Sequence, residues 1–176
     1  MNALREECQQ LHDELIALRR EFHRAPELGL HEYHTAARIE RELDRCGIPH
    51  ERVGETAVVG HLTGSGNGSG LVVLRADIDA LPIQETNDVP YRSQRPGCMH
   101  GCGHDGHMTI LLLLARWIAK NRARLHCNVV LLFQPGEEGW AGARRMIDDG
   151  ALENPRVDCV YGLHLWPTAP KGRIGV

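Results

Sequence analysis

The stretch "MHGCGHDGHMTILLLLARWIAKN" (residues 99–121) joins two contrasting patterns. Its second half is apolar enough to form a well-buried helix. Its first half sets electron-pair donors between glycines. Donors crowded onto so bare a backbone are either loose surface residues of a flexible turn or ligands gathered round a metal ion. The donors are His100, Cys102, His104, Asp105 and His107.

Strand-like and helix-like segments alternate on both sides of this stretch. The alternation predicts a layered α/β fold in one domain, with a largely parallel sheet begun by a hairpin. Apolar periodicity and turn residues define the segments. The predicted elements are helices at 4–22 (ended by Pro26), 36–46 (ended by Gly47), 106–121 and 140–150, and strands at 56–64, 71–79, 128–135 and 158–166, with the turn 65–69 joining the first two strands.

Composition excludes several classes of partner. Lys and Arg number 20 against 23 Asp and Glu, for a formal net charge of -3, and no basic stripe suggests nucleic acid. The longest apolar run, residues 110–115, is far too short to span a bilayer. Residues 1–22 are charged throughout and lack the apolar core of a secretory signal. We therefore expect a cytoplasmic protein that binds neither nucleic acid nor membrane.

Six cysteines occur, and a cytoplasmic location makes disulfides unexpected. Cys8, Cys46, Cys127 and Cys159 lie in apolar periodic segments, where cysteine is usually a small buried hydrophobe. Cys102 differs because its neighbours are glycines and histidines.

Polar clusters follow the predicted strands or precede the buried helix. In open α/β sheets, the carboxyl ends of the strands line the crevice where ligands bind. We therefore expect the clusters to converge on one edge of the sheet. They are "RADIDALP" (75–82), "CGHD" (102–105), "PGEEG" (135–139) and "GLHLWP" (162–167).

The residue types indicate a metal site. Thiolate, imidazole and carboxylate ligands together suit zinc, with manganese, cobalt or nickel as alternatives. The adjacent Glu137 and Glu138 point in different directions, so that one carboxylate can bind metal while the other faces a water molecule and takes its proton.

Each element also has a simpler interpretation. Adjacent glutamates are common in solvated turns, and His164 alone on a strand is typical of a core histidine. Asp77 and Asp79 can cap the loop after their strand, and His61 has no donor nearby in sequence, which favours a structural role. A small structural zinc site is a further alternative, although its ligand spacing does not match finger or ribbon patterns. Its ligands would be Cys98, Cys102, His104 and His107.

Five motifs together resemble a known family. They occur in the order seen in the aminoacylase-type metallopeptidases of peptidase family M20, and they are most similar to its amidohydrolase branch. That branch includes hippurate hydrolases, N-acyl-amino-acid deacylases and auxin-conjugate hydrolases. The motifs are "FHRAPELGLHE" (22–32), "RADIDALPI" (75–83), "MHGCGHDGH" (99–107), "FQPGEEG" (133–139) and "GLHLWP" (162–167).

The resemblance implies roles for individual residues and a three-layer α/β/α sandwich with a mostly parallel mixed sheet. Glu137 is implied as the general base, and Asp77 as a support of the metal site. Arg75 stands where relatives place a histidine ligand. The implied cofactors are two divalent ions per complete site, zinc or manganese with cobalt or nickel as alternatives. Their implied ligands here are Cys102, His104, Glu138 and His164.

Family members are roughly twice as long as this chain. We therefore expect residues 1–176 to form the N-terminal portion of the catalytic domain, without the lid and dimerisation domain or the C-terminal part of the catalytic domain. A sheet open at one edge favours association, so a homo-oligomer is one expectation. Two functions remain open: hydrolysis of the amide bond of N-acyl amino acids, hippurate-like or N-acetyl, or an inactive fragment that retains partial metal binding or associates with another chain.

Overall fold

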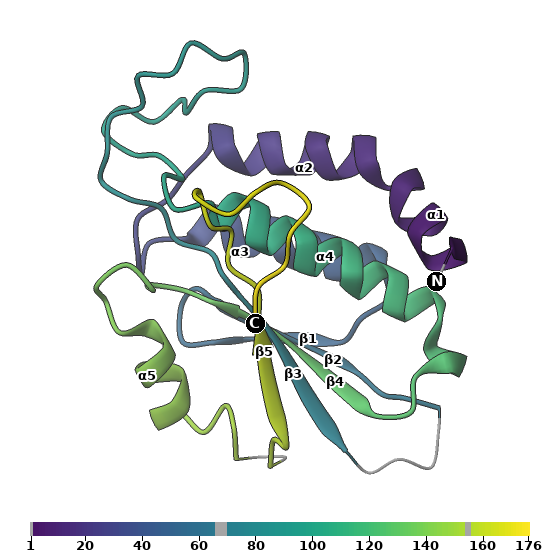
Figure 1. The fold of residues 1–176 in the computed structure, drawn as a ribbon. Helices are drawn as coiled ribbons and strands as arrows, with labels where there is room; N and C mark the ends of the chain where they lie inside the picture. The colour runs from purple at the N-terminus through teal and green to yellow at the C-terminus, as the bar shows by residue number, and fades with distance from the viewer. Residues whose placement is uncertain (1, 66–69, 154–155) are drawn as a thin grey trace.

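The computed structural model describes residues 2–65, 70–153 and 156–176 (Figure 1). One five-stranded sheet has helices on both faces. The helices are α1 (Asn2–Gln10), α2 (His12–Arg24), α3 (Tyr33–Arg45), α4 (His104–Lys120) and α5 (Gly142–Asp148). The strands are β1 (His50–Val53), β2 (Ala57–Leu62), β3 (Leu71–Asp77), β4 (Asn128–Gln134) and β5 (Cys159–Gly162).

The strand order is β1-β2-β4-β3-β5. The pairs β1–β2 and β2–β4 are antiparallel, whereas β3 pairs in parallel with both β4 and β5. This mixed sheet confirms the α/β fold class. The parallel half, β4-β3-β5, brings the carboxyl ends of three strands to the same edge.

The predicted hairpin between 56–64 and 71–79 is wrong. β4 lies between β2 and β3, because its continuous apolar run is buried on both faces of the sheet and takes the central position. Most of the predicted turn, 66–69, lies outside the described residues. A hairpin does begin the sheet, but β1 and β2 form it. The polar sequence of β1, "HERV", carries little strand signal.

Two apolar clusters cover opposite faces of the sheet. Val129, Leu131 and Phe133 of β4 face α2, α3 and α4, whereas Val130 and Leu132 alternate to the face covered by α5. Figure 1 shows α2, α3 and α4 on one side of the sheet and α5 on the other. These are the three layers that the resemblance implies.

The predicted helix over 4–22 is two helices that meet at Leu11. Cys8 is exposed, so its prediction as a buried hydrophobe is wrong, and Cys46, Cys127 and Cys159 are only half-buried. Cys8 lies on α1, which is shorter than the predicted helix, and its apolar spacing from Leu4 and Leu11 does not bring it into the core. All six thiols are free.

The opening stretch forms α4 and the loop before it. α4 begins at His104, directly after Gly103, whose φ of +94° favours glycine. Its apolar side chains pack against the sheet, so its N-terminus points to the edge where β3, β4 and β5 end (Figure 1). None of the described helices is long and apolar enough to cross a membrane.

Candidate metal centre

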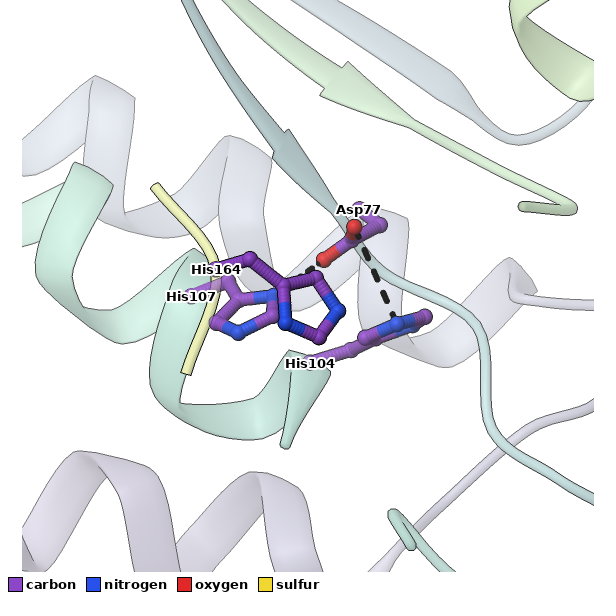
Figure 2. A group of neighbouring side chains, drawn as sticks. All are labelled: Asp77, His104, His107 and His164. Atoms are coloured by element: carbon purple, nitrogen blue, oxygen red, sulfur yellow. Dashed lines mark hydrogen bonds and ion pairs between the residues drawn. The ribbon is translucent and has the colours of Figure 1, made fainter. Parts of the chain in front are cut away.

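The predicted clusters converge at the edge where β3, β4 and β5 end. Two groups of donor side chains form there, and they share His104. Within each group the donor atoms lie within 4.8 Å of one another. Figure 2 shows the first group, in which dashed contacts run from Asp77 to both His104 and His107. The first group is Asp77, His104, His107 and His164; the second is Cys102, His104 and Glu138.

The His104 ring is held from one side and free on the other. Its Nδ1 lies 2.8 Å from the backbone carbonyl of Asp79, so Nδ1 donates its proton there. Among the described residues, its buried Nε2 has no hydrogen-bond partner, and neither has the buried Oε1 of Glu138, 3.8 Å away. These two buried atoms each offer a free electron pair and face each other, so a cation bound between them would satisfy both.

Charge around His104 also favours a cation. Burial alone would lower the pKa of His104, but the hydrogen bond to Asp79 and the charge of Asp77 outweigh it and raise the pKa. In the absence of metal, a proton can therefore supply the positive charge that the carboxylates attract.

Asp79 connects two of the converging segments. Its Oδ2 accepts a hydrogen bond of 2.9 Å from the backbone N–H of Glu138, while its carbonyl holds His104. Burial would raise the pKa of Asp79, but the bonds from His104 and from the backbone outweigh it and lower the pKa. Asp79 is thus an anion that fixes the turn carrying Glu137 and Glu138 against α4.

The glutamate pair lies open on one side. The Glu137 side chain is 42% exposed and its Oε2 lies 3.8 Å from Nε2 of His104. The Glu138 side chain is 23% exposed and directs its buried oxygen to the same nitrogen. The turn is therefore partly exposed, but both carboxylates also lie near a buried imidazole, which a simple solvated turn does not explain.

Cys102 and His164 complete the donor set. Sγ of Cys102 lies 3.5 Å from Nε2 of His164, and Nδ1 of His164 donates to the Leu165 carbonyl at 2.8 Å. Burial, followed by the neighbouring Glu138, raises the pKa of the Cys102 thiol to about 11. His164 is exposed and lies beyond the end of β5, so its interpretation as a core histidine is wrong.

Asp77 and His107 have their polar atoms occupied. Nδ1 of His107 donates to Oδ1 of Asp77 at 2.5 Å, and Nε2 accepts the backbone N–H of Leu165 at 2.8 Å. Oδ2 of Asp77 accepts a bond of 2.7 Å from Arg75. The pair thus braces α4, the end of β3 and the loop that carries His164.

The bracing role of His107 was missed from sequence. The spacing of His104 and His107 is the signal that could have found it, because residues three apart on a helix share a face. Their ring centroids are 5.3 Å apart.

The other sequence candidates lie outside both donor groups. Cys98 is buried elsewhere, which disfavours the four-residue structural zinc site with Cys102, His104 and His107. His61 lies on β2 beside Glu51, at 3.3 Å, which fits a structural role. His100 is buried with both ring nitrogens unpaired among the described residues, and burial lowers its pKa to about 4.

Comparison with known proteins identifies relatives over most of this chain. The protein named as amidohydrolase YhaA of Bacillus subtilis (strain 168) is 46% identical over 164 residues, which make up 92% of this chain and 41% of YhaA. An uncharacterized hydrolase of Staphylococcus saprophyticus is 45% identical over 158 residues, covering 89% of this chain and 40% of that hydrolase. The chain thus spans about 40% of the length of the curated relatives it matches.

A solved structure has the same fold. The crystal structure of the YXEP protein of Bacillus subtilis, described as a dinuclear metal binding peptidase from the M20 family, matches with a TM-score of 0.86 at 37% identity. The match covers 92% of this chain and 45% of YXEP. The family model of Peptidase family M20/M25/M40 matches residues 73–176, which is more than half of the chain and includes both donor groups. The chain belongs to peptidase family M20/M25/M40.

Proposed function

We propose that this chain is the metal-binding part of a hydrolase that cleaves the amide bond of N-acyl amino acids. The observation that carries the proposal is the pair of buried, unpaired donor atoms, Nε2 of His104 and Oε1 of Glu138, with the carboxylate of Glu137 beside them. Family membership and the dinuclear metal binding described for YXEP support it.

The donor set fits divalent ions. We assign the ligand role to the four side chains whose donor atoms point into the site and are not taken up by the bracing bonds of Asp77 and His107. A thiolate, imidazoles and a carboxylate suit zinc or manganese, with cobalt or nickel as alternatives, at two ions per complete site. Bound ions would supply Lewis-acid activation of water and of the scissile carbonyl. The proposed ligands are Cys102, His104, Glu138 and His164.

The difference between the two glutamates supports a division of roles. Glu138 is the less exposed, and Asp79 holds its backbone N–H in place. Glu137 is nearly half exposed and can reach both a water molecule and a substrate. In the proposed reaction, Glu137 accepts a proton from the attacking water and passes it to the leaving nitrogen. Asp79 and His107 keep the other groups in position.

The proposal extends to the arrangement of the whole protein. Residues 1–176 correspond to the N-terminal portion of the catalytic domain, supported by the match to about 40% of the relatives' length. A lid and dimerisation domain and the rest of the catalytic domain would complete the site. Substrates are small N-acyl amino acids, and a homo-oligomer is part of the proposal.

A second candidate function rests on the edge strand β5. β5 pairs with β3 along one side, and Val160 and Tyr161 on it are 48% and 62% exposed. An apolar strand edge of this kind favours pairing with another chain. This edge supports the association part of the second candidate, a catalytically inactive fragment that retains partial metal binding or associates with another chain.

One experiment separates the two candidates. Purified protein is loaded with manganese or zinc, dialysed, and assayed for bound metal and for release of amino acid from N-acyl amino acids. Retained metal with release of amino acid supports the hydrolase. Retained metal without release shows that residues 1–176 do not suffice for turnover, as expected if the rest of the catalytic domain completes the site. Loss of all metal contradicts the hydrolase and leaves association with another chain as the second candidate.

A further inference from the structure

A hollow opens directly beside the candidate metal centre, and Glu138 is part of its lining. Its volume is about 390 Å³, which lies within the range of about 300–1,000 Å³ typical of small-molecule sites. One wall comes from the loop after α2, another from the segment after β3, and the third from the turn after β4. Its lining residues are Leu28, Ala80, Pro82, Glu138, Gly139 and Trp140.

Two glycines leave the space that the Trp140 side chain occupies in the lining of the hollow. Trp140 is 50% exposed, and its indole lies against Gly29. A Cβ added to Gly29 would lie 2.3 Å from Cδ1 and 2.8 Å from Nε1 of Trp140, and one added to Gly136 would lie 3.0 Å from its Cβ. Any larger residue at 29 would push the indole out of its place.

The two loops that meet at Trp140 each hold one residue in an uncommon backbone conformation. Leu30 and Ala141 have φ of +65° and +54°, and they are the two non-glycine residues of the described chain with positive φ. The N–H of Gly136 donates to the buried carboxylate of Glu32 at 2.9 Å, which ties the two loops together. Strained backbone of this kind concentrates at ligand sites, where it fixes the geometry in advance.

The charges around the hollow decide which part of a substrate fits. Apart from Glu138, its lining is uncharged, and none of its lining residues is Lys or Arg. An N-acyl amino acid carries its carboxylate on the amino-acid side of the scissile bond. An acyl group brings no charge into this lining, whereas the substrate carboxylate would find no Lys or Arg side chain in it to pair with.

We propose that this hollow, the Trp140 pocket, binds the acyl group of the substrate and selects flat apolar acyl groups, such as benzoyl, over acetyl. The inference rests on the proposed function and narrows its substrate class from hippurate-like or N-acetyl substrates to the hippurate-like ones. An aromatic ring in the pocket packs between Leu28 and Pro82 and meets the Trp140 indole edge-to-face or offset. An acetyl group leaves most of the pocket unfilled.

The test measures binding, so it does not depend on turnover. The affinities of N-benzoylglycine and N-acetylglycine are compared by equilibrium dialysis, with zinc-loaded and with metal-free protein. Burying a ring favours N-benzoylglycine by about tenfold or more. Trp140→Ala, at a half-exposed position, should lower this preference at least about fivefold, and Leu28→Ala, on the facing wall, should lower it too. Tyr161→Ala removes an exposed aromatic side chain outside the pocket and should leave the preference unchanged.

The outcomes distinguish this inference from the proposed function. A preference for benzoyl that depends on Trp140 supports the pocket even when no amide is hydrolysed. Equal affinity for the two ligands overturns the pocket assignment. A preference for benzoyl that survives both pocket variants, or that falls equally in Tyr161→Ala, overturns it as well. Each of these results counts against the pocket even when the protein hydrolyses both substrates. Circular dichroism and thermal melts of each variant confirm that the fold is retained.

Discussion

The backbone carbonyl of Asp79 lies 2.8 Å from Nδ1 of His104 and thereby fixes which ring nitrogen carries the proton. The carboxylate of the same aspartate accepts the backbone N–H of Glu138. One residue just beyond the end of β3 therefore orients two proposed metal ligands that come from different segments. Groups that orient ligands in this way typically change metal affinity about 10–100-fold when mutated.

We expect Asp79→Asn to weaken zinc binding by about 10–100-fold while the fold is retained. The amide oxygen can still accept the N–H of Glu138, but the negative charge beside His104 is lost. Competition with a chromophoric chelator measures the affinity. Asp158→Asn is the matched control, because Asp158 accepts the backbone N–H of Leu71 at 2.8 Å and belongs to neither donor group. Equal affinities for both variants would contradict the role assigned to Asp79.

Substitution of each of the two adjacent glutamates should affect a different property of the protein. In a form of the protein that turns over substrate, Glu137→Gln should reduce kcat by about two to four orders of magnitude and leave metal content intact. The amide keeps the shape of the side chain but cannot accept the proton of water. Glu138→Gln should instead lower metal content. The opposite pattern in metal analysis would show that the two roles are reversed.

A buried network beside the site predicts a pH-dependent contribution to stability. Nδ1 of His23 lies 2.8 Å from Asp105, and Nε2 lies 3.2 Å from Glu85. The bond to Asp105 raises the pKa of His23 although burial opposes it. Because the pKa is raised in the folded state, protonated His23 stabilises the fold. This contribution to the free energy of unfolding is fully present below the unfolded pKa of about 6.5. It is lost as pH rises through the folded pKa.

His23→Gln should therefore destabilise the protein more at pH 5.5 than at pH 9. Thermal melts at the two pH values measure the difference, and each 1 kcal/mol corresponds to about 2–4 °C for a chain of this size. His61→Gln, on the exposed side of β2, is the control and should show a smaller pH dependence. A larger loss at pH 9 than at pH 5.5 for His23→Gln would contradict the assigned charge state.

The elements with strong local patterns were predictable from sequence. The apolar run of α4 and the continuous run of β4 each indicate burial by themselves, and Gly47, with φ of +61°, ends α3 as expected. The convergence of the polar clusters also followed, because parallel strands bring their carboxyl ends to one edge.

Other features depend on partners distant in sequence. The position of β4 between β2 and β3 is decided by which strand buries most apolar surface, and no local signal in 56–79 reports it. His107 has the same residue type as His104, and only its bonds to Asp77 and Leu165 identify it as a brace.

Metal binding should release a proton from Cys102. Burial raises the pKa of this thiol to about 11, so it is protonated at neutral pH, whereas the thiolate is the form that binds metal. Apparent zinc affinity should therefore increase with pH across the range 7–9. Calorimetry in buffers of different ionisation enthalpy counts the protons released. Cys102→Ser should release about one proton fewer per zinc, and an unchanged count would remove Cys102 from the ligand set.

The number of ions held tightly tests the site as it stands in this chain. Four protein ligands are proposed, and four are enough to hold one zinc tetrahedrally. They are too few to clamp two ions about 3.5–4 Å apart while leaving an open position for substrate. We expect fewer than two equivalents of zinc per chain after dialysis, with little or no hydrolysis. Elemental analysis together with an amino-acid release assay measures both quantities. Two tightly held equivalents accompanied by measurable deacylation would show that the residues of this chain are a sufficient ligand set.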